Sequence, residues 1–181
     1  NDLENFISFN TQFNQPLNSW NTISLTSVFS AFNGSTSFNQ DLDNWNVSGC
    51  NNFASLFLNA VSFNGNISTW DVSNVTLFNN LFNNAESFNG DLNDWTTTSL
   101  TNLTQTFRDT NDFNKPLNNW NTSSVSSMAF CFRRALSFNQ DISDWSFVSV
   151  TNMSGFMQFK TENDYNANYL SNLLIKLDQD L

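Results

Sequence analysis

The chain has 181 residues and a formal net charge of −10, because sixteen Asp and Glu residues outnumber six Lys and Arg, and it contains no histidine. The lack of histidine excludes Ser-His-Asp and Cys-His catalysis and histidine-ligated zinc or haem, so we expect a protein that is not an enzyme. The acidic balance argues against nucleic acid as a partner, since a phosphate backbone is bound by clustered Lys and Arg.

The start of the chain, NDLENF, has no methionine and neither the basic nor the apolar segment of a signal peptide. Leu3, Phe6 and Ile7 already occupy positions of the repeat described below, so we expect an uncapped, truncated N-terminus with further repeats or a domain upstream. An uncapped coil would expose core and backbone edge, which predicts self-association through this end. No apolar run reaches the ~18 residues of a membrane-spanning helix, so we expect no direct membrane insertion.

A repeat of 25 residues organises the chain up to about residue 157. Its most regular column is tryptophan, at Trp20, Trp45, Trp70, Trp95, Trp120 and Trp145. A second column is phenylalanine followed by asparagine, with the asparagines at Asn14, Asn39, Asn64, Asn89, Asn114 and Asn139. A strict period with apolar columns, in units too short to bury a core alone, is typical of a solenoid whose coils stack on one another.

Two local patterns indicate the structure within each coil. Met128, Cys131 and Phe132 have i, i+3, i+4 spacing, which predicts one short helical or 3₁₀ turn per coil. The stretch from Phe to Trp is interpreted as extended with a bend, since Pro16 and Pro116 disfavour a helix there. The predicted fold class is therefore a repeat solenoid with a parallel β-sheet and one short helical or 3₁₀ turn per coil.

The repeat ends after Met157, and residues 158–181 have another pattern. Apolar residues then recur at three- and four-residue steps, at Tyr169, Leu170, Leu173, Leu174, Leu177 and Leu181. This spacing predicts an amphipathic helix laid over the last coil. The expected organisation is a solenoid of about six repeats over residues 1–157 and a C-terminal cap with this helix over 158–181.

The repeated columns have a structural and a functional interpretation. The tryptophans either pack in the core or form an exposed row on which sugar rings stack, and we favour the core because the residue recurs in every coil. The six asparagines are expected to form an inward ladder that satisfies backbone groups at the bend. Cys50 and Cys131 lie in different columns three coils apart, about 14 Å along the axis, which is too far for a disulfide, so both are expected to be buried and free.

Charged residues suggest two further sites. Acidic pairs recur in alternate repeats and could contribute oxygen ligands to calcium, although no EF-hand spacing is present. We favour a solvated surface role for these acids and expect no cofactor. The candidate calcium ligands are Asp41, Asp43, Asp91, Asp94, Asp141 and Asp144. Arg108, Arg133 and Arg134 could contact an anion or an acidic glycan, but Asp109 and Asp112 favour ordinary ion pairs.

Units such as SFNQDLDNWNVS, TWDVSNVT and SFNQDISDW with SVTNMSGFM resemble the BspA-like surface-protein repeat, a leucine-rich-repeat relative of 25 to 26 residues. The resemblance covers about residues 1–157. It implies a curved, leucine-rich-repeat-like solenoid on an exported protein that adheres to host or matrix molecules, and it supplies no catalytic residues. Repeat four departs from the pattern, since WTTTSLTNL lacks the usual Asp-Val-Ser.

These observations lead to one expected function and two alternatives. We expect a non-enzymatic extracellular module at the cell surface that binds a host, matrix or cell-surface protein or glycan. The alternatives are a structural spacer or filament-forming scaffold, and a solenoid that binds ice or another flat surface. The candidate row for surface binding is Thr22, Val47, Val72, Thr97, Thr122 and Phe147.

Overall fold

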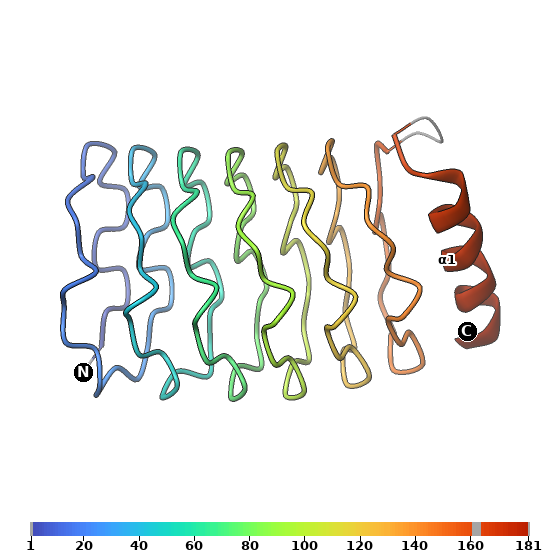
Figure 1. Cartoon of the computed structure of the whole chain (residues 1–181), viewed down its shortest axis with the longest axis horizontal. Helices are drawn as coiled ribbons and strands as arrows, with labels where there is room; N and C mark the ends of the chain where they lie inside the picture. Colours follow the sequence, from blue (N-terminus) through green and yellow to red (C-terminus); the bar gives the residue numbers. More distant parts are fainter. Residues whose placement is uncertain (1, 161–163, 181) are drawn as a thin grey trace.

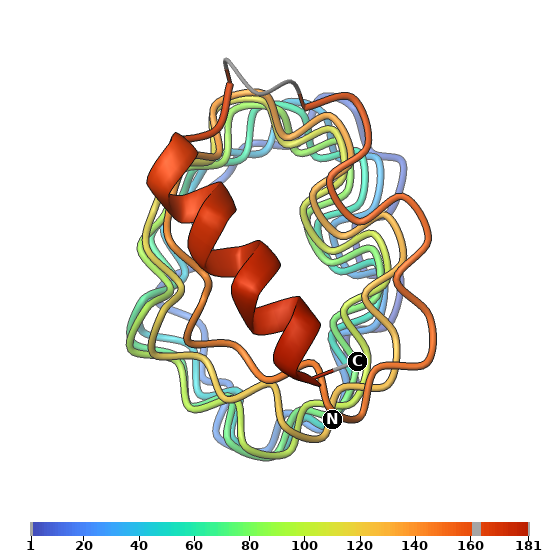
Figure 2. The ribbon, with the colours of Figure 1, turned by 90° about the vertical axis from the view of Figure 1, so that its right-hand side faces the viewer.

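Residues 2–160 and 164–180 are described by a computed structural model, in which successive coils lie side by side from the N-terminus to a C-terminal helix (Figure 1). Viewed along the stack, the coils superpose on a common outline, with the helix across the last coil (Figure 2). Buried hydrophobic side chains fill the interior of the coils. Neighbouring coils are in register at 25 residues, as the parallel bridge between Leu77 and Asn102 illustrates. The 25-residue period of the sequence is therefore the period of the stack.

The predicted parallel β-sheet is wrong. In the described part of the chain the only β-structure consists of isolated parallel bridges, and these join Asp2 to Ser27, Asn52 to Leu77, Leu77 to Asn102, Asn102 to Ser127 and Ser127 to Asn152. The predicted helical or 3₁₀ turn in each coil is also wrong, because the corresponding residues form consecutive non-helical turns. Among the described residues the helix α1, Ala167–Asp180, is the only helix.

The backbone hydrogen bonds explain why no sheet forms. In one coil, four N–H groups donate to carbonyls of the next coil at 2.8 to 3.1 Å: Phe78 to Asn102, Asn80 to Thr104, Phe82 to Thr106 and Asn84 to Arg108. Between them, the N–H groups of Leu81 and Asn83 donate to the carbonyl three residues earlier in their own coil, at 2.9 and 3.3 Å. A strand between two neighbours sends alternate N–H groups to opposite sides. Here the N–H groups of Leu81 and Asn83 close local turns instead of reaching the preceding coil.

Left-handed backbone accompanies these turns at two positions of each coil, four residues apart. The φ angles lie between 54° and 71° at Asn5, Ser30, Ser55, Asn80, Gln105, Phe130 and Gly155, and at Phe9, Gly34, Asn59, Asn84, Asp109, Arg134 and Phe159. The conformational energy of an L-residue other than glycine is about 1–2 kcal/mol higher in this left-handed conformation. The alternation of handedness prevents the i, i+3, i+4 pattern from forming a helix. We call the side of the stack formed by these residues the αL face.

Replacing Ser55, with φ 57°, by glycine is expected to raise the free energy of unfolding by about 1 kcal/mol, because glycine adopts positive φ without a Cβ clash. The measurement is chemical denaturation followed by circular dichroism. The matched control is Ser62→Gly, since Ser62 does not have positive φ and glycine there should lower stability by about 0.5–1 kcal/mol. Equal effects of the two substitutions would contradict the assigned backbone conformation.

The core consists of columns of aromatic rings that stack from coil to coil. Phe57 and Phe82 lie with ring centroids 5.7 Å apart and an interplanar angle of 3°, and Phe63 and Phe88 lie 5.8 Å apart at 1°. The two columns also contact each other within a coil, where the rings of Phe82 and Phe88 are 4.0 Å apart. Because these rings are fully buried, the aromatic columns form one continuous core along the axis.

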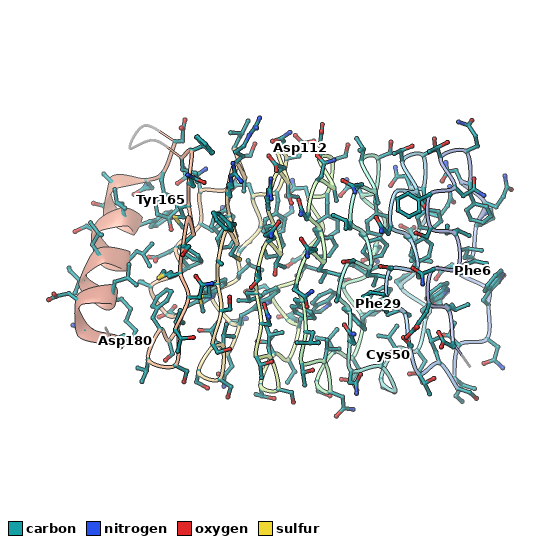
Figure 3. The ribbon with its side chains drawn as sticks, turned by 180° about the vertical axis from the view of Figure 1, so that it is seen from behind. Phe6, Phe29, Cys50, Asp112, Tyr165 and Asp180 are labelled. Carbon is teal, nitrogen blue, oxygen red and sulfur yellow. The ribbon has the colours of Figure 1, made fainter. Side chains whose placement is uncertain are left out.

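The C-terminal segment takes the place of a further coil over part of the last one. The Asn166 N–H donates to Asn139 Oδ1 at 2.7 Å, which is the bond that each repeated asparagine receives from the next coil. The Tyr165 hydroxyl donates to the Gln140 carbonyl at 2.8 Å, and the Phe147 N–H donates to Asp180 Oδ2 at 2.9 Å. The segment is thus fastened to the stack before α1 begins and at its last residue (Figure 3).

The apolar face of α1 is narrower than its sequence pattern predicts. Leu173 is buried, and Leu170 and Leu177 pack against the core at their partly buried positions. Leu174 is 57% exposed, so it does not belong to the packed face. Leu181 lies outside the described residues. The described helix is neither long nor apolar enough to cross a bilayer.

Candidate functional site

The tryptophan column belongs to the core and does not form an exposed row. All repeated tryptophans except the first are at most 4% exposed. Each of these indole Nε1–H groups donates to a carbonyl of the preceding coil: Trp45 to Leu17, Trp70 to Leu42, Trp95 to Ile67, Trp120 to Leu92 and Trp145 to Leu117. Trp20, in the first coil, is 41% exposed. The buried tryptophans therefore stack the coils and cannot present rings to a sugar.

The asparagine ladder exists, but it lies at the surface and not inside. The side-chain oxygen of each asparagine accepts the backbone N–H of the asparagine in the next coil, for example Asn64 Oδ1 from Asn89 at 2.9 Å and Asn89 Oδ1 from Asn114 at 3.0 Å. The six residues Asn14, Asn39, Asn64, Asn89, Asn114 and Asn139 are exposed or partly exposed. Their bonds hold neighbouring coils together along an outer edge.

The acidic residues considered for calcium take part in local hydrogen bonds. Asp41 Oδ1 accepts the Asn66 N–H at 2.8 Å, and Asp43 Oδ1 accepts Asn18 Nδ2 at 2.6 Å. Burial would raise the pKa of Asp141, but hydrogen bonds from Ser143 and Asn172 hold it below its usual value. Within the residues that the structure covers, no three acidic or cysteine side chains come together as metal ligands. Asp41, Asp43, Asp91, Asp94, Asp141 and Asp144 are thus not gathered into one site.

The row considered for ice or surface binding faces the interior. Its members Thr22, Val47, Val72, Thr97, Thr122 and Phe147 are all buried, with exposed fractions of 8% or less. The threonine hydroxyls bond the backbone, as where Thr97 Oγ1 accepts the Asn121 N–H at 2.8 Å and donates to its carbonyl at 3.1 Å. This row cannot contact a crystal surface, and the interpretation that rested on it is wrong.

Cys50 and Cys131 are free and buried, which confirms the prediction that they form no disulfide. Burial, with a smaller effect from the charge of Asp2, raises the pKa of Cys50 to about 11. Burial also raises the pKa of the Cys131 thiol. Both thiols are therefore protonated at neutral pH, and neither is poised as a nucleophile.

We expect both thiols to react with a disulfide reagent at least about 100-fold more slowly in the folded protein than in denaturant, since reaction requires local opening. Raising the pH from 7 to 8.5 should accelerate the reaction of the unfolded chain, because its thiols then ionise. The reaction of the folded chain should stay slow. The measurement is the absorbance of the released thiolate over time. Rapid reaction of one equivalent in the folded state would contradict the burial of that cysteine.

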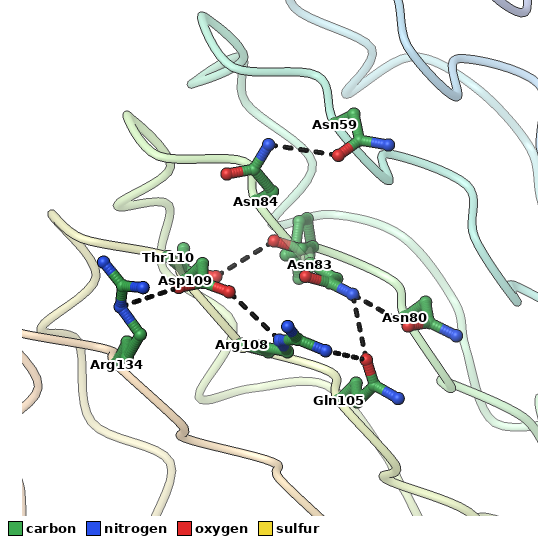
Figure 4. Close-up of polar contacts among 10 residues, drawn as sticks. Asn59, Asn80, Asn83, Asn84, Gln105, Arg108, Asp109, Thr110 and Arg134 are labelled. Carbon is green, nitrogen blue, oxygen red and sulfur yellow. Dashed lines mark hydrogen bonds and ion pairs between the residues drawn. The ribbon is translucent and has the colours of Figure 1, made fainter. Parts of the chain in front are cut away.

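A polar network occupies the αL face in the middle coils (Figure 4). Gln105 Oε1 accepts bonds from Arg108 Nη1 at 2.8 Å and from Asn83 Nδ2 at 3.2 Å. Asp109 forms ion pairs with Arg108 Nε at 3.0 Å and with Arg134 Nε at 3.2 Å. One carboxylate thus bridges two arginines from neighbouring coils, as the sequence led us to expect for part of the group.

Arg133 is the member of the group that Asp109 does not pair with. Its guanidinium carbon lies 5.6 Å from the centroid of the Phe130 ring and 5.2 Å from that of Phe159. Its Nε is buried and has no hydrogen-bond partner, and no ion pair joins Arg133 to any residue that the structure describes. The sequence does not indicate this arrangement directly, because Phe130, Arg133 and Phe159 occupy three different positions of the 25-residue register, within four residues of one another.

The first coil offers a second candidate surface at the opposite end from α1. Phe6 and Trp20 contact edge to face with centroids 5.2 Å apart, and both are about 40% exposed. Phe6 lies at this end of the stack (Figure 3). Beside them is a small open cavity of about 90 Å³, lined by Asp2, Leu3, Trp20, Asn21, Thr22 and Leu25.

The fold and these surfaces define a repeat protein made of stacked 25-residue coils whose repeated side chains hold the coils together. The chain matches the family described as "Mycoplasma protein of unknown function, DUF285", over residues 1–95 and 63–172. It belongs to this family, and the two overlapping matches agree with its repeated structure. No curated protein and no solved structure matches the chain.

Proposed function

We propose that the chain is a non-enzymatic extracellular module that mediates adhesion at a cell surface by binding protein or glycan partners. The observation that supports this function most is that repeated and variable side chains have different roles. The repeated Phe, Trp and Asn residues are engaged in stacking the coils, whereas the residues that differ from coil to coil lie on the outside, as at Asn84, Asp109 and Arg134. The resemblance to BspA-like surface repeats supports the same function.

A rigid stack also suits weak contacts made at several places. Side chains at equivalent positions of neighbouring coils lie at a regular spacing, which is 5.7 to 6.0 Å between the centroids of stacked Phe rings in the core, so contacts to one extended partner can act together. Several weak contacts that form simultaneously give a much higher avidity than any one of them. This is the kind of binding that attachment to a glycan or matrix surface requires.

The experiment is a screen of the labelled, monodisperse protein on glycan and matrix-protein arrays, once with calcium and once with chelator. A saturable signal for a defined ligand is expected. Loss of the signal in chelator would show that binding requires a metal ion. A blank result under both conditions would contradict the proposed function and favour a spacer or scaffold.

Self-association through the first coil is the second candidate, supported by the exposed Phe6 and Trp20 and the cavity beside them. Because α1 lies over the opposite end, we propose that two first coils pair and produce a dimer, not a filament. Sedimentation velocity over a range of concentrations tests this. A dimer that Phe6→Ser abolishes supports the pairing, whereas a monomer at every concentration, or growing polymers, would contradict it.

A further inference from the structure

Arg133 sits between two aromatic side chains that come from different coils. Phe130 is in the same coil as Arg133, and Phe159 is in the next one. Both phenylalanines have positive φ, 56° and 71°, a conformation that is rare for bulky residues. The Phe130 ring also covers Gly155 so closely that a Cβ there would lie 2.4 Å from it. The absence of a side chain at Gly155 thus gives the Phe130 ring its place beside the guanidinium.

The neighbouring arginines differ from Arg133 in how their charge is compensated. Arg108 and Arg134 share the carboxylate of Asp109, and Arg108 also bonds Gln105. Arg133 has ring contacts but no hydrogen bond from its guanidinium to a described residue. A guanidinium has five N–H donors, and donors without partners are unusual where the side chain is partly buried. The geometry leaves Arg133 with donors to offer to a ligand.

The charge distribution restricts what that ligand can be. Arg108, Arg133 and Arg134 are half of all the cationic residues of a chain whose net charge is −10, and a single carboxylate compensates them here. A polyanion would meet the repulsion of the rest of the chain, whereas one carboxylate would meet only the local excess of positive charge. The site therefore suits a ligand with an isolated negative group.

The aromatic rings add a second requirement. Phe159 is 58% exposed, so its ring is available to an apolar face of a ligand next to the guanidinium. Arginine binds a carboxylate through two parallel hydrogen bonds in its plane, so a bound carboxylate does not compete with rings that pack on the guanidinium. A sugar ring with a carboxylate combines a C–H face for Phe159 and a planar anion for Arg133. The acidic side chain of a peptide has no ring face beside its carboxylate that could pack on Phe159, so a peptide meets only the first of the two requirements.

We propose that Arg133, Phe130 and Phe159 form a binding site for the carboxylate of an acidic sugar. This inference rests on the proposed surface-binding function and names a ligand class for one of its contacts. Arg133 binds the carboxylate, Phe159 packs on the sugar ring, and Phe130 holds the guanidinium from its other side. Arg134, paired with Asp109, does not take part.

The test is a titration of the whole chain with methyl glucuronide and with the neutral methyl glucoside at physiological salt, followed by NMR chemical shifts. Binding of the uronide should be at least about tenfold tighter than that of the glucoside, the effect of one charge-assisted contact. Arg133→Gln should weaken uronide binding by about tenfold or more. Phe159→Ala, a change at an exposed side chain, should weaken it by about threefold.

Arg134→Gln is the matched control, because it removes the same charge one residue away. It should change uronide binding by less than about threefold, as expected of an exposed ion pair. Equal losses of affinity in Arg133→Gln and Arg134→Gln would show that the uronide responds to the overall positive charge and not to one site, which would overturn the proposal. So would equal binding of the two sugars, or tighter binding of an acidic peptide at the same residues.

Failure of this site can be distinguished from failure of the proposed function. If the wild-type protein binds a ligand on the arrays and Arg133→Gln binds it equally well, the module binds through another surface. If the arrays are blank and the uronide does not shift the resonances near Arg133, both proposals are wrong.

Discussion

Replacement of Phe88 by alanine is expected to lower the free energy of unfolding by about 3–5 kcal/mol. The ring is fully buried and contacts three others, with centroids 4.0 Å from Phe82, 5.8 Å from Phe63 and 6.0 Å from Phe113. Alanine would leave a cavity in the middle of the stack, where rigid neighbours on both sides restrict relaxation. Denaturant unfolding followed by circular dichroism measures the loss.

The control for this substitution is Phe9→Ala. Phe9 is 72% exposed, and alanine retains the same positive φ, so the change in stability should stay within about 1 kcal/mol. A loss below about 1 kcal/mol for Phe88→Ala would show that its column does not stabilise the core. Comparable losses at Phe88 and Phe9 would mean that the two residues are similarly buried.

Trp120→Phe is the second substitution with a large expected effect, a loss of about 2–4 kcal/mol. Trp120 Nε1 donates to the Leu92 carbonyl at 2.8 Å, and its ring stacks on Trp95 at 6.4 Å and on Trp145 at 6.1 Å. Phenylalanine fills less of the space and leaves the buried carbonyl of Leu92 without its indole donor. The measurement is again the denaturation midpoint and slope by circular dichroism.

Trp20→Phe makes the same chemical change in the same column of the first coil. Trp20 is 41% exposed, and its indole makes no hydrogen bond to a described residue, so we expect a loss of less than about 1 kcal/mol. The difference between Trp120 and Trp20 measures what stacking between two coils contributes. A small effect at both positions would contradict a structural role for the column.

Much of the stack follows from the sequence because side-chain periodicity reports directly on what is equivalent in space. The spacing of Trp70, Trp95 and Trp120 established the 25-residue register, and the different columns of Cys50 and Cys131 established that they cannot be bonded. The three- and four-residue steps after Met157 placed a helix where α1 lies. Each of these conclusions needs only the positions of side chains along the chain.

The backbone was harder to predict, because its hydrogen bonds are common to all residues. Apolar columns agree equally well with extended strands and with the alternating turns that the coils contain. Asn80, Gly34 and Asp109 are of residue types that favour left-handed backbone and could have indicated it. In other coils Phe130 and Phe159 occupy the positions that correspond to Asn80 and Asp109, and phenylalanine gives no such indication.

The candidate site was predicted in part for a similar reason. The register placed Arg108 and Arg133 in one column, and nearby acids indicated ion pairs, which formed with Arg108 and Arg134. Which arginine stays without a carboxylate depends on side-chain geometry within the two coils. The flanking rings of Phe130 and Phe159 belong to different columns, so periodicity alone does not bring them together.

The one-way hydrogen bonds of the αL face give the stack an electrical polarity. There, three or four N–H groups per coil, such as those of Phe78 and Phe82, point toward the next coil, and the carbonyls that accept them point back, whereas outside this face fewer N–H groups, such as those of Thr76 and Ser87, donate to the preceding coil. Peptide dipoles that align in this way add, with their positive end toward the C-terminal coils. Every added coil lengthens this dipole, so in proteins of this architecture the number of repeats determines the field at the ends as well as the length.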